Sequence, residues 1–405
     1  MISVDEYRDS IVNGLQPLLP IELPLTECHG CVLAEDVTAP WPLPSFDNSS
    51  MDGYAVIASD VASASAESPV ALKVIDDVPA GFRATETVVP GSCIRIMTGA
   101  PMPDGADAVV PVENTDGGVG EVVITQGSDA GAYIRRIGED VLLGDEVMRA
   151  GTLISARHLA VIAAVGRGTL RVIPKPRVAV ISTGSELVEP GTKLNKGLIS
   201  DSNSFLLVAA ATEAGAQAYR VPPVVDDAEA FRTAVFDQLH RADLILTSGG
   251  VSMGAYDTVK EVFTELGTVE FLKVAMQPGM PQGHGFVGED RVPIITLPGN
   301  PVSSFISFQN FVRPAIARLR GLDAAPRPTI RVTLDAAMTS PENKRQFARG
   351  RFVGANVVTP VGAGQGSHVV GGLAASDCLI VIPEGVSSVA AGALVDVVDL
   401  RGDIR

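Results

Sequence analysis

The sequence runs an apolar strand into a turn of small residues three times, as RVAVISTGSEL (177–187), LILTSGGVSMG (244–254) and IITLPGNPVSS (294–304). Uninterrupted apolar runs predict strands that are buried on both faces of a parallel sheet. Open α/β sheets bind ligands at the carboxyl ends of their strands, where each of these turns lies. Gly and Ser let the backbone approach an anion closely and direct N–H groups at it. The three segments therefore predict an α/β domain with a ligand site at one edge of its sheet.

Helical segments alternate with these strands. Residues 200–215 begin with Ser, Asp and Asn and reach Gly215, which is typical of the start and stop of a helix. A second helix is predicted within 225–242, and a third follows the LPGN turn, where Pro301 suits a first helical turn. Alternating strands and helices predict right-handed crossovers and a doubly wound α/β domain over residues 176–322.

The rest of the chain predicts smaller regions around this domain. Apolar residues at helical spacing predict an amphipathic helix within 4–18, and short strand-like pieces with turn residues predict β domains over 46–137 and 323–405. The first of these β domains is inserted into a helix and strand region formed by residues 1–45 and 138–175. The predicted fold class is thus α/β plus β, in an elongated chain of several domains.

Composition excludes several classes of function. The chain has 405 residues, too many for one ordinary domain, and a formal net charge of −16. That charge argues against a general nucleic-acid or anionic-membrane surface, since both need a basic footprint. The N-terminus lacks the basic and apolar regions of a signal peptide, and no apolar stretch reaches the roughly 20 residues that span a bilayer. We therefore expect a cytoplasmic protein that is not embedded in a membrane.

The four cysteines fit that compartment. Cys28 and Cys31 form C-H-G-C, but no second pair follows, and Cys93 and Cys378 are isolated. A closed zinc site needs four ligands, and a redox pair needs a thioredoxin-like context. We interpret the pair as small apolar residues that open a strand.

Acids and hydroxyls beside glycines carry the chemistry that the sequence offers, because the common nucleotide, zinc-peptidase and serine-hydrolase motifs are missing. These residues are Asp52, Thr98, Glu186, Asp226 and Asp257. Carboxylates at strand ends beside anion-binding turns are what a magnesium–phosphate site requires. Each residue also has a structural interpretation: Asp226 or Asp227 as a helix cap, Asp52 as a turn residue, Glu186 in the first turn of a helix, Thr98 at a plain strand end, and Asp201 in a cap.

Taken together, the motifs resemble one family. FDNSSMDGYAV, RIMTGAPMPDGADAVVPVE, IRRIGEDV, VAVISTGSEL, TSGGVSMGAYD, LPGNPVSS and GQGSH occur in the order found in molybdopterin molybdenumtransferases, the bacterial MoeA proteins and the gephyrin E domain. The resemblance covers nearly the whole chain. It implies four regions and an elongated homodimer, with molybdopterin adenylyltransferase as a pathway partner. The implied reaction inserts molybdate into adenylylated molybdopterin and releases AMP, with Mg²⁺ required.

The resemblance also implies a site in which two chains meet. Glu186, Asp226 and Asp257 would organise Mg²⁺ and the pterin, while Asp52 and Thr98 of the partner chain would orient molybdate or the adenylate. The turns would hold phosphate through backbone N–H groups. The residues implied for cofactor binding are Ser248, Gly249, Gly250, Lys273, Pro298, Gly299, Asn300 and Pro301.

One loop departs from the family pattern. Many members carry lysines in K-P-G-K-P, where this chain has Gln277-Pro278-Gly279-Met280-Pro281, although Lys273 is retained. A hydrogen bond to a charged group contributes about 1.5–3 kcal/mol, so we expect weaker binding of an anionic substrate. Two functions stay open: the transferase, and a gephyrin-like dimeric scaffold that binds a cytoplasmic segment of a membrane or cytoskeletal partner through the last β domain.

Overall fold

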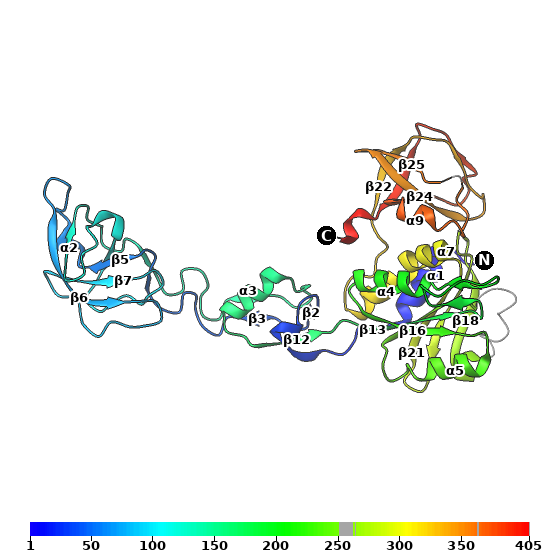
Figure 1. The fold of residues 1–405 in the computed structure, drawn as a ribbon, viewed down its shortest axis with the longest axis horizontal. Coiled ribbons are helices and arrows are strands. Elements are labelled where there is room, and N and C mark those ends of the chain that lie inside the picture. Colours follow the sequence, from blue (N-terminus) through cyan, green and yellow to red (C-terminus); the bar gives the residue numbers. More distant parts are fainter. Residues whose placement is uncertain (251–261, 264, 363, 405) are drawn as a thin grey trace. The chain divides into compact units, whose positions relative to one another are not determined.

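The computed structural model describes residues 1–250, 262–263, 265–362 and 364–404, without the side chains of residues 403 and 404 (Figure 1). The chain forms two compact units, which are described separately. Unit 1 comprises Met1–Glu22, Gly30–Ala34 and Arg171–Arg405, and unit 2 comprises Leu23–His29 and Glu35–Leu170. Across the part of the chain that is described, no helix has the length and apolar character needed to cross a membrane.

A six-stranded sheet forms the centre of unit 1, in the order β16-β13-β17-β21-β20-β18. The first four strands are parallel, and the last two are antiparallel additions at one edge. The three strand-to-turn segments of the sequence supply the adjacent strands β13, β17 and β21, so the predicted α/β domain is confirmed. The antiparallel edge was not predicted. The strand bounds are β13 Arg177–Thr183, β16 Gln217–Val224, β17 Leu244–Ser248, β18 Gly267–Lys273, β20 Pro281–Val287 and β21 Val292–Leu297.

Helices cover both faces of this sheet, and each face has its own apolar core. One core includes Leu207 of α4 and Ile306 of α7, packed with Leu246 of β17. The other includes Phe231 and Val235 of α5, packed with Ile245 of β17. Alternate residues of β17 therefore face opposite cores, as expected of a strand buried on both sides. The helical bounds are α4 Asn203–Glu213, α5 Ala228–Phe236, α7 Pro301–Ser307, η3 Phe308–Val312 and α8 Arg313–Leu319.

The first helix, α1 (Val4–Gly14), packs into unit 1. Ser3 and Glu6 form a capping box at its start, and Val4, Tyr7 and Ile11 are buried. These three side chains belong to the same core as α4 and α7. The sequence had grouped residues 1–45 with 138–175, whereas the apolar face of this helix is buried against the α/β domain. The division into four regions otherwise stays a prediction.

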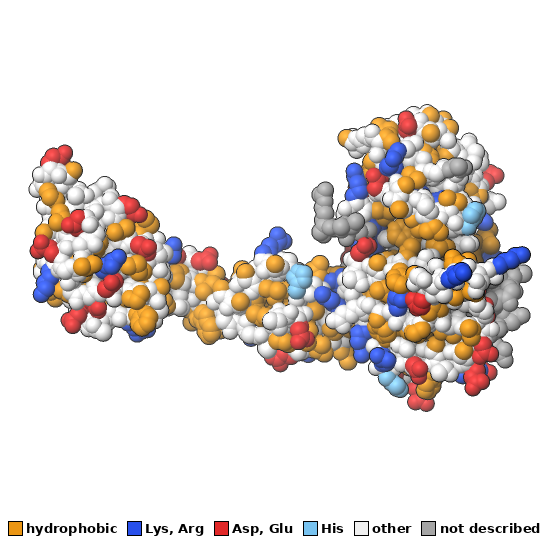
Figure 2. Space-filling view, viewed as in Figure 1, with side chains coloured by type: hydrophobic (Ala, Val, Ile, Leu, Met, Phe, Trp, Pro, Cys, Tyr) orange, Lys and Arg blue, Asp and Glu red, His pale blue; other side chains and the backbone are white. Residues whose placement is uncertain are grey.

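The C-terminal part of unit 1 is a second sheet, in the order β19-β24-β25-β22-β28-β26, with a core of its own. Phe347, Leu379 and Val398 of this part also join the core that contains α1. Figure 2 shows apolar side chains gathered where the two parts of unit 1 meet. The bounds are β19 Met276–Gln277, β22 Thr329–Leu334, β24 Arg345–Gly354, β25 Val357–Pro360, β26 Cys378–Ile382 and β28 Leu394–Asp399.

Unit 2 contains a five-stranded sheet in the order β8-β5-β7-β6-β9. Apolar residues of these strands form two clusters, one on Tyr54, Cys93 and Val110 and one on Ala55, Ile94 and Val109. The alternation along β5 and β7 matches strands buried on both faces. The strands are β5 Gly53–Val56, β6 Val70–Val78, β7 Ser92–Ile96, β8 Ala108–Pro111 and β9 Glu121–Ile124.

Short elements complete the chain. They are β1 Ile21–Pro24, η1 Leu25–Glu27, β2 Val32–Leu33, β3 Val37–Thr38, β4 Asn48–Ser49, α2 Ala58–Val61, η2 Val112–Asn114, β10 Ile134–Arg135, β11 Glu146–Met148, α3 Ala156–Ala164, β12 Thr169–Ile173, β14 Leu187–Val188, β15 Ile199–Ser200, β23 Met338–Thr339, α9 Gly371–Ala374, β27 Ser388–Val389 and η4 Arg401–Ile404. All four cysteines are buried and free, and no cluster of three metal-ligating side chains occurs within the described residues.

Candidate functional site

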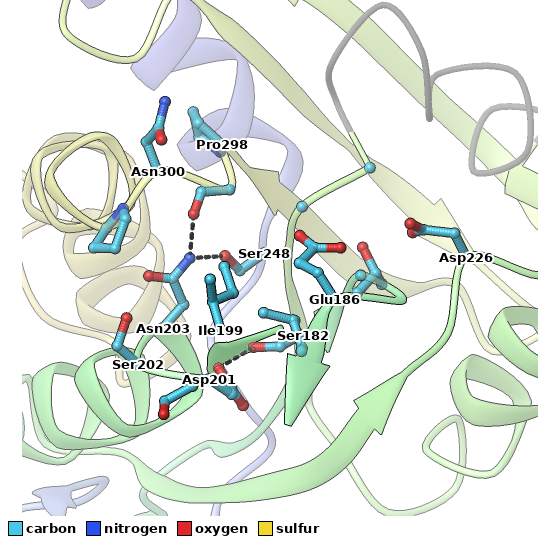
Figure 3. Close-up of a pocket in the computed structure, with 18 of the residues that line it drawn as sticks. Ser182, Glu186, Ile199, Asp201, Ser202, Asn203, Asp226, Ser248, Pro298 and Asn300 are labelled. Atoms are coloured by element: carbon cyan, nitrogen blue, oxygen red, sulfur yellow. Dashed lines mark hydrogen bonds between the residues drawn. The ribbon is translucent and has the colours of Figure 1, made fainter. Parts of the chain in front are cut away.

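A cavity of about 430 Å³ opens at the carboxyl ends of β13, β17 and β21 in unit 1. All three predicted turns line it, together with the segment that leads into α4. Figure 3 shows Glu186 and Asp226 toward one end of this cavity and Asn203, Pro298 and Asn300 toward the other. The cavity thus occupies the edge of the sheet at which the sequence predicts a ligand.

Two carboxylates define the acidic end of the cavity. Asp226 and Ser185 exchange hydrogen bonds: Asp226 N–H donates to Ser185 Oγ (3.0 Å), and Ser185 N–H donates to Asp226 Oδ2 (3.3 Å). A Cβ on Gly184 would lie 2.9 Å from the Glu186 carboxylate, so that side chain folds back over Gly184. The turn after β13 therefore brings Glu186 and Asp226 to the same end of the cavity, although they are far apart in sequence.

The structure separates the two neighbouring acids of the predicted helix start. Asp227 is the N-cap of α5, and its side chain accepts a hydrogen bond from Ala230 N–H (2.8 Å). Asp226 lines the cavity instead. The structural interpretation of Glu186 as a first-turn residue is wrong, because β14 and an irregular segment follow it and α4 begins only at Asn203.

The two glycine-containing turns lie against each other at the other end. Gly249 has a φ of +100°, and a Cβ there would lie 2.5 Å from the carbonyl oxygen of Thr183. Only glycine fits both constraints. A Cβ on Gly299 would lie 3.6 Å from the Cα of Gly249, and Gly249 N–H donates to Leu297 O (3.1 Å). The predicted binding residues from Ser248 to Gly250 and from Pro298 to Pro301 all line the cavity.

The segment SDSNS (200–204) contributes more than the helix cap that the sequence predicts. Asp201 does cap α4, accepting from Ser204 N–H (3.1 Å), but its buried carboxylate also accepts from Ser182 Oγ (3.0 Å). Asn203 donates to Ser248 Oγ and to Gly299 O, each at 2.6 Å. Both residues line the cavity and were missed as site residues. Their signal was an excess of polar side chains over what one cap needs.

Cations do not line the cavity among the described residues. Lys273 is exposed on β18, where it pairs with Pro281 of β20, and only Pro281 reaches the cavity lining. Gln277 pairs with Gln346 across β19 and β24, and both line a separate hollow. Of the groups that line the described part of the cavity, backbone N–H groups and a metal ion held by the two carboxylates could offset the charge of an anion.

Asp52 and Thr98 lie together in unit 2. Asp52 Oδ1 accepts hydrogen bonds from Thr98 N–H (2.7 Å) and from Thr98 Oγ1 (2.8 Å). The bond from the Thr98 backbone is the main cause that lowers the pKa of the Asp52 carboxyl below its usual value of 3.8. At neutral pH, Asp52 is therefore an ionised carboxylate that Thr98 holds in a fixed orientation. Asp257, the fifth predicted catalytic residue, lies outside the described residues.

The donor set of the cavity fits Mg²⁺. This ion binds one or two carboxylates and keeps the rest of its octahedral shell for water and phosphate oxygens. Glu186 and Asp226 supply two carboxylates at one end of a cavity whose remaining lining is neutral except for the fully hydrogen-bonded Asp201. Asp201 has its oxygens engaged by Ser182, Ser204 and Arg220, so it is not available as a metal ligand.

Three family models match the chain in order. They are the MoeA N-terminal region (domain I and II) at residues 2–166, a probable molybdopterin binding domain at 179–318, and the MoeA C-terminal region (domain IV) at 331–400.

Relatives match over the full length. Molybdopterin molybdenumtransferase 2 of Mycobacterium tuberculosis is 46% identical, over 99% of this chain and 100% of that protein. Molybdopterin molybdenumtransferase of Haemophilus influenzae is 34% identical, over 98% of each. Two crystal structures of molybdopterin biosynthesis MoeA protein from Pyrococcus horikoshii match with TM-scores of 0.78 and 0.71, at 31% and 27% identity, covering 99% and 98% of this chain and 100% and 99% of theirs.

Proposed function

Since this chain belongs to the MoeA family and acts as a transferase in molybdenum cofactor biosynthesis, we propose that it inserts molybdate into adenylylated molybdopterin and releases AMP, with Mg²⁺ bound at Glu186 and Asp226. The observation that carries this proposal is the cavity in which these two carboxylates face two glycine-containing turns. Such an arrangement suits a ligand with a phosphoanhydride, because the anion needs both close N–H donors and a metal.

The turns supply the N–H donors in this proposal. Within the described residues, the N–H groups of Gly299 and Asn300 have no acceptor, and both residues line the cavity. Backbone donors at fixed positions stabilise developing negative charge without having to reorganise. Mg²⁺, when bound, would offset charge on the phosphate oxygens as the bond to AMP breaks. Glu186 and Asp226 would hold that ion, and Asp257 is proposed as a third acidic group.

Asp52 and Thr98 complete the proposed site from a second copy of the chain. An ionised Asp52 whose orientation Thr98 fixes can accept a proton or a hydrogen bond from a water molecule in the site. We propose a homodimer in which this pair serves the cavity of the partner. Molybdopterin adenylyltransferase, which would supply the substrate, is the proposed pathway partner.

The direct test is AMP release. Purified protein with adenylylated molybdopterin, molybdate and Mg²⁺ should release AMP, and Asp226→Asn should reduce the rate at least about a hundredfold, as expected for loss of an electrostatic group in the transition state. Glu229→Gln, an exposed acid in the first turn of α5, is the matched control. Equal rates for wild type and Asp226→Asn would overturn the proposal.

Subunit mixing tests the shared site. Asp52→Asn and Glu186→Gln should each be inactive alone, and a refolded mixture should regain activity, because one of the two sites in a mixed dimer then contains neither change. An inactive mixture whose dimers have exchanged, as measured by mass, would show that each chain forms its own site.

A second candidate is a scaffold that binds a peptide segment. A cavity of about 210 Å³ lies between α1 and the C-terminal sheet, with Phe347, Leu379 and Val381 among its apolar lining and Arg345 beside them. Thr329→Arg would fill this cavity from an exposed position, and Val353→Arg on the same sheet is the control. A partner that wild type and Val353→Arg retain and Thr329→Arg loses would favour this role.

A further inference from the structure

The start of α4 is the common attachment point of the three turns that line the cavity. The turn after β13 is tied to it by the hydrogen bond from Ser182 Oγ to Asp201 (3.0 Å). The turns after β17 and β21 are tied to it by Asn203, which donates to Ser248 Oγ and Gly299 O (Figure 3). Each turn is therefore connected to one segment that comes from none of the three strands.

The orientation of the Asn203 amide follows from its partners. Gly299 O can only accept a hydrogen bond, so the amide nitrogen must face it. Asn203 is 8% exposed, and its Oδ1 has no partner within the described residues. A buried amide that forms only part of its hydrogen bonds is costly to keep, which indicates that the two bonds made by its nitrogen matter.

A hydroxyl chain extends this connection beneath the turns. Ser248 Oγ lies 3.3 Å from Ser304 Oγ in α7, and Ser304 Oγ donates to Pro298 O. Both serines are buried. Asn203 thus contacts the turn after β21 directly at Gly299 O and is also connected to it through two serines, the second of which donates to Pro298 O.

We propose that Asn203 is a positioning residue for the phosphate-binding turns, which rests on the function proposed above. Its amide sets the separation of the Ser248–Gly250 and Pro298–Asn300 turns, and thereby the positions of the Gly299 and Asn300 N–H groups, which have no acceptor within the described residues. The ligand class that this arrangement selects is an adenylate or other phosphate ester. Asn203 touches the turns and does not itself bind the phosphate.

Two substitutions separate the hydrogen bonds from the shape of the side chain. Asn203→Ala removes both, whereas Asn203→Asp keeps the shape but presents a carboxylate, which has no hydrogen to donate to Gly299 O. Gln238→Ala is the matched control, because Gln238 is a comparably buried amide (5% exposed) that accepts from Tyr219 and lies outside the cavity lining.

The first measurement needs no ligand. Hydrogen–deuterium exchange of the peptide covering residues 244–250 reports on Gly249 N–H, which is protected by its bond to Leu297 O between the two turns. Exchange should rise at least about tenfold in Asn203→Ala and Asn203→Asp. In Gln238→Ala, exchange of this peptide should rise no more than exchange of the other peptides of unit 1.

The second measurement is AMP affinity by calorimetry with Mg²⁺ present. We expect a loss of about ten- to hundredfold in both Asn203 variants and less than threefold in Gln238→Ala. Faster exchange with unchanged AMP affinity would show a purely structural role and overturn the proposal, as would unchanged exchange. A wild type that binds no AMP would instead overturn the proposed function, and the exchange data alone would then show whether Asn203 positions the turns.

Discussion

Arg345 of β24 forms a bidentate ion pair with Asp5 of α1, with Nη1–Oδ1 and Nη2–Oδ2 distances of 3.1 and 2.8 Å. The two residues are 340 positions apart in sequence. The hydrogen bond from Arg345 is the largest cause that lowers the pKa of the Asp5 carboxyl, and burial opposes it. This pair links the first helix to the C-terminal sheet.

We expect Asp5→Asn to lower the free energy of unfolding of unit 1 by about 0.5–1 kcal/mol at pH 7, since Asp5 is nearly half exposed and solvent screens the pair. A carboxyl whose pKa is lower in the folded state stabilises the fold above its unfolded value of 3.8 and loses that contribution as the pH falls below it. Urea unfolding should show a larger difference between wild type and variant at pH 7 than at pH 3. Asp9→Asn, on the same helix without the Arg345 contact, is the control.

The partly buried histidine of β20, His284, should make stability depend on pH in a different range. Burial lowers the pKa of His284 below its usual 6.5, against a smaller opposite effect of Glu270, which faces it across the strands β18 and β20. Tyr7 and Ser10 of α1 cover the ring and supply no charge. The unfolded chain therefore binds a proton more readily than the folded chain.

Stability should fall as the pH decreases from 7.5 through 6.5 toward the lower folded pKa, with a slope of at most about 1.4 kcal/mol per pH unit. His284→Gln should flatten this part of the curve, and the exposed His240→Gln should leave it unchanged. Parallel curves for wild type and His284→Gln would contradict the prediction. Thermal or urea unfolding at several pH values measures the effect.

Gly249→Ala should disrupt the cavity beyond the ordinary cost of a left-handed backbone. That cost is about 1 kcal/mol, and the new Cβ would in addition meet the Thr183 carbonyl at 2.5 Å. Gly392 has a φ of +85° with open space around its Cβ position, so Gly392→Ala carries the backbone cost alone. We expect Gly249→Ala to lose at least tenfold in AMP affinity, while Gly392→Ala keeps it. Titration calorimetry with AMP on both variants measures this difference in affinity.

Asp52→Asn should abolish transfer without changing AMP binding to unit 1. The amide keeps an oxygen that can accept from Thr98 but has no charge. We expect a fall of at least about a hundredfold in AMP release, with unfolding unchanged within about 0.5 kcal/mol because the carboxylate is exposed. Asp60→Asn, which replaces an acid that accepts from Gly91 N–H in the same unit, serves as control. A fully active Asp52→Asn would remove Asp52 from the mechanism.

Much of the fold was determined by local sequence. The stretches 178–181, 244–246 and 292–295 are apolar without interruption, and strands with such a centre are typical of a sheet covered on both faces. Local chemistry also determined the ends of elements: Asp227 caps α5, and Gly215, with a φ of +89°, follows α4. These features depend on neighbours within a few residues, so a sequence alone expresses them.

Tertiary structure decided which residues share a site. From the sequence, Glu186 and Asp226 could each have had a purely structural role, in the first turn of a helix or as a helix cap. Only the parallel pairing of β13 with β16 brings the ends of their segments together. The polar run 200–204 exceeds what one helix cap needs, but it does not show which residues Asn203 contacts, because its two partners lie 45 and 96 positions further along the chain. The same holds for α1, whose periodicity shows an apolar face but not the surface that buries it. Periodicity, helix capping and turn formation depend on residues close together in the chain, so the sequence alone predicts them. Which side chains meet in one site depends on strand order and register, and these are fixed only when the whole core packs.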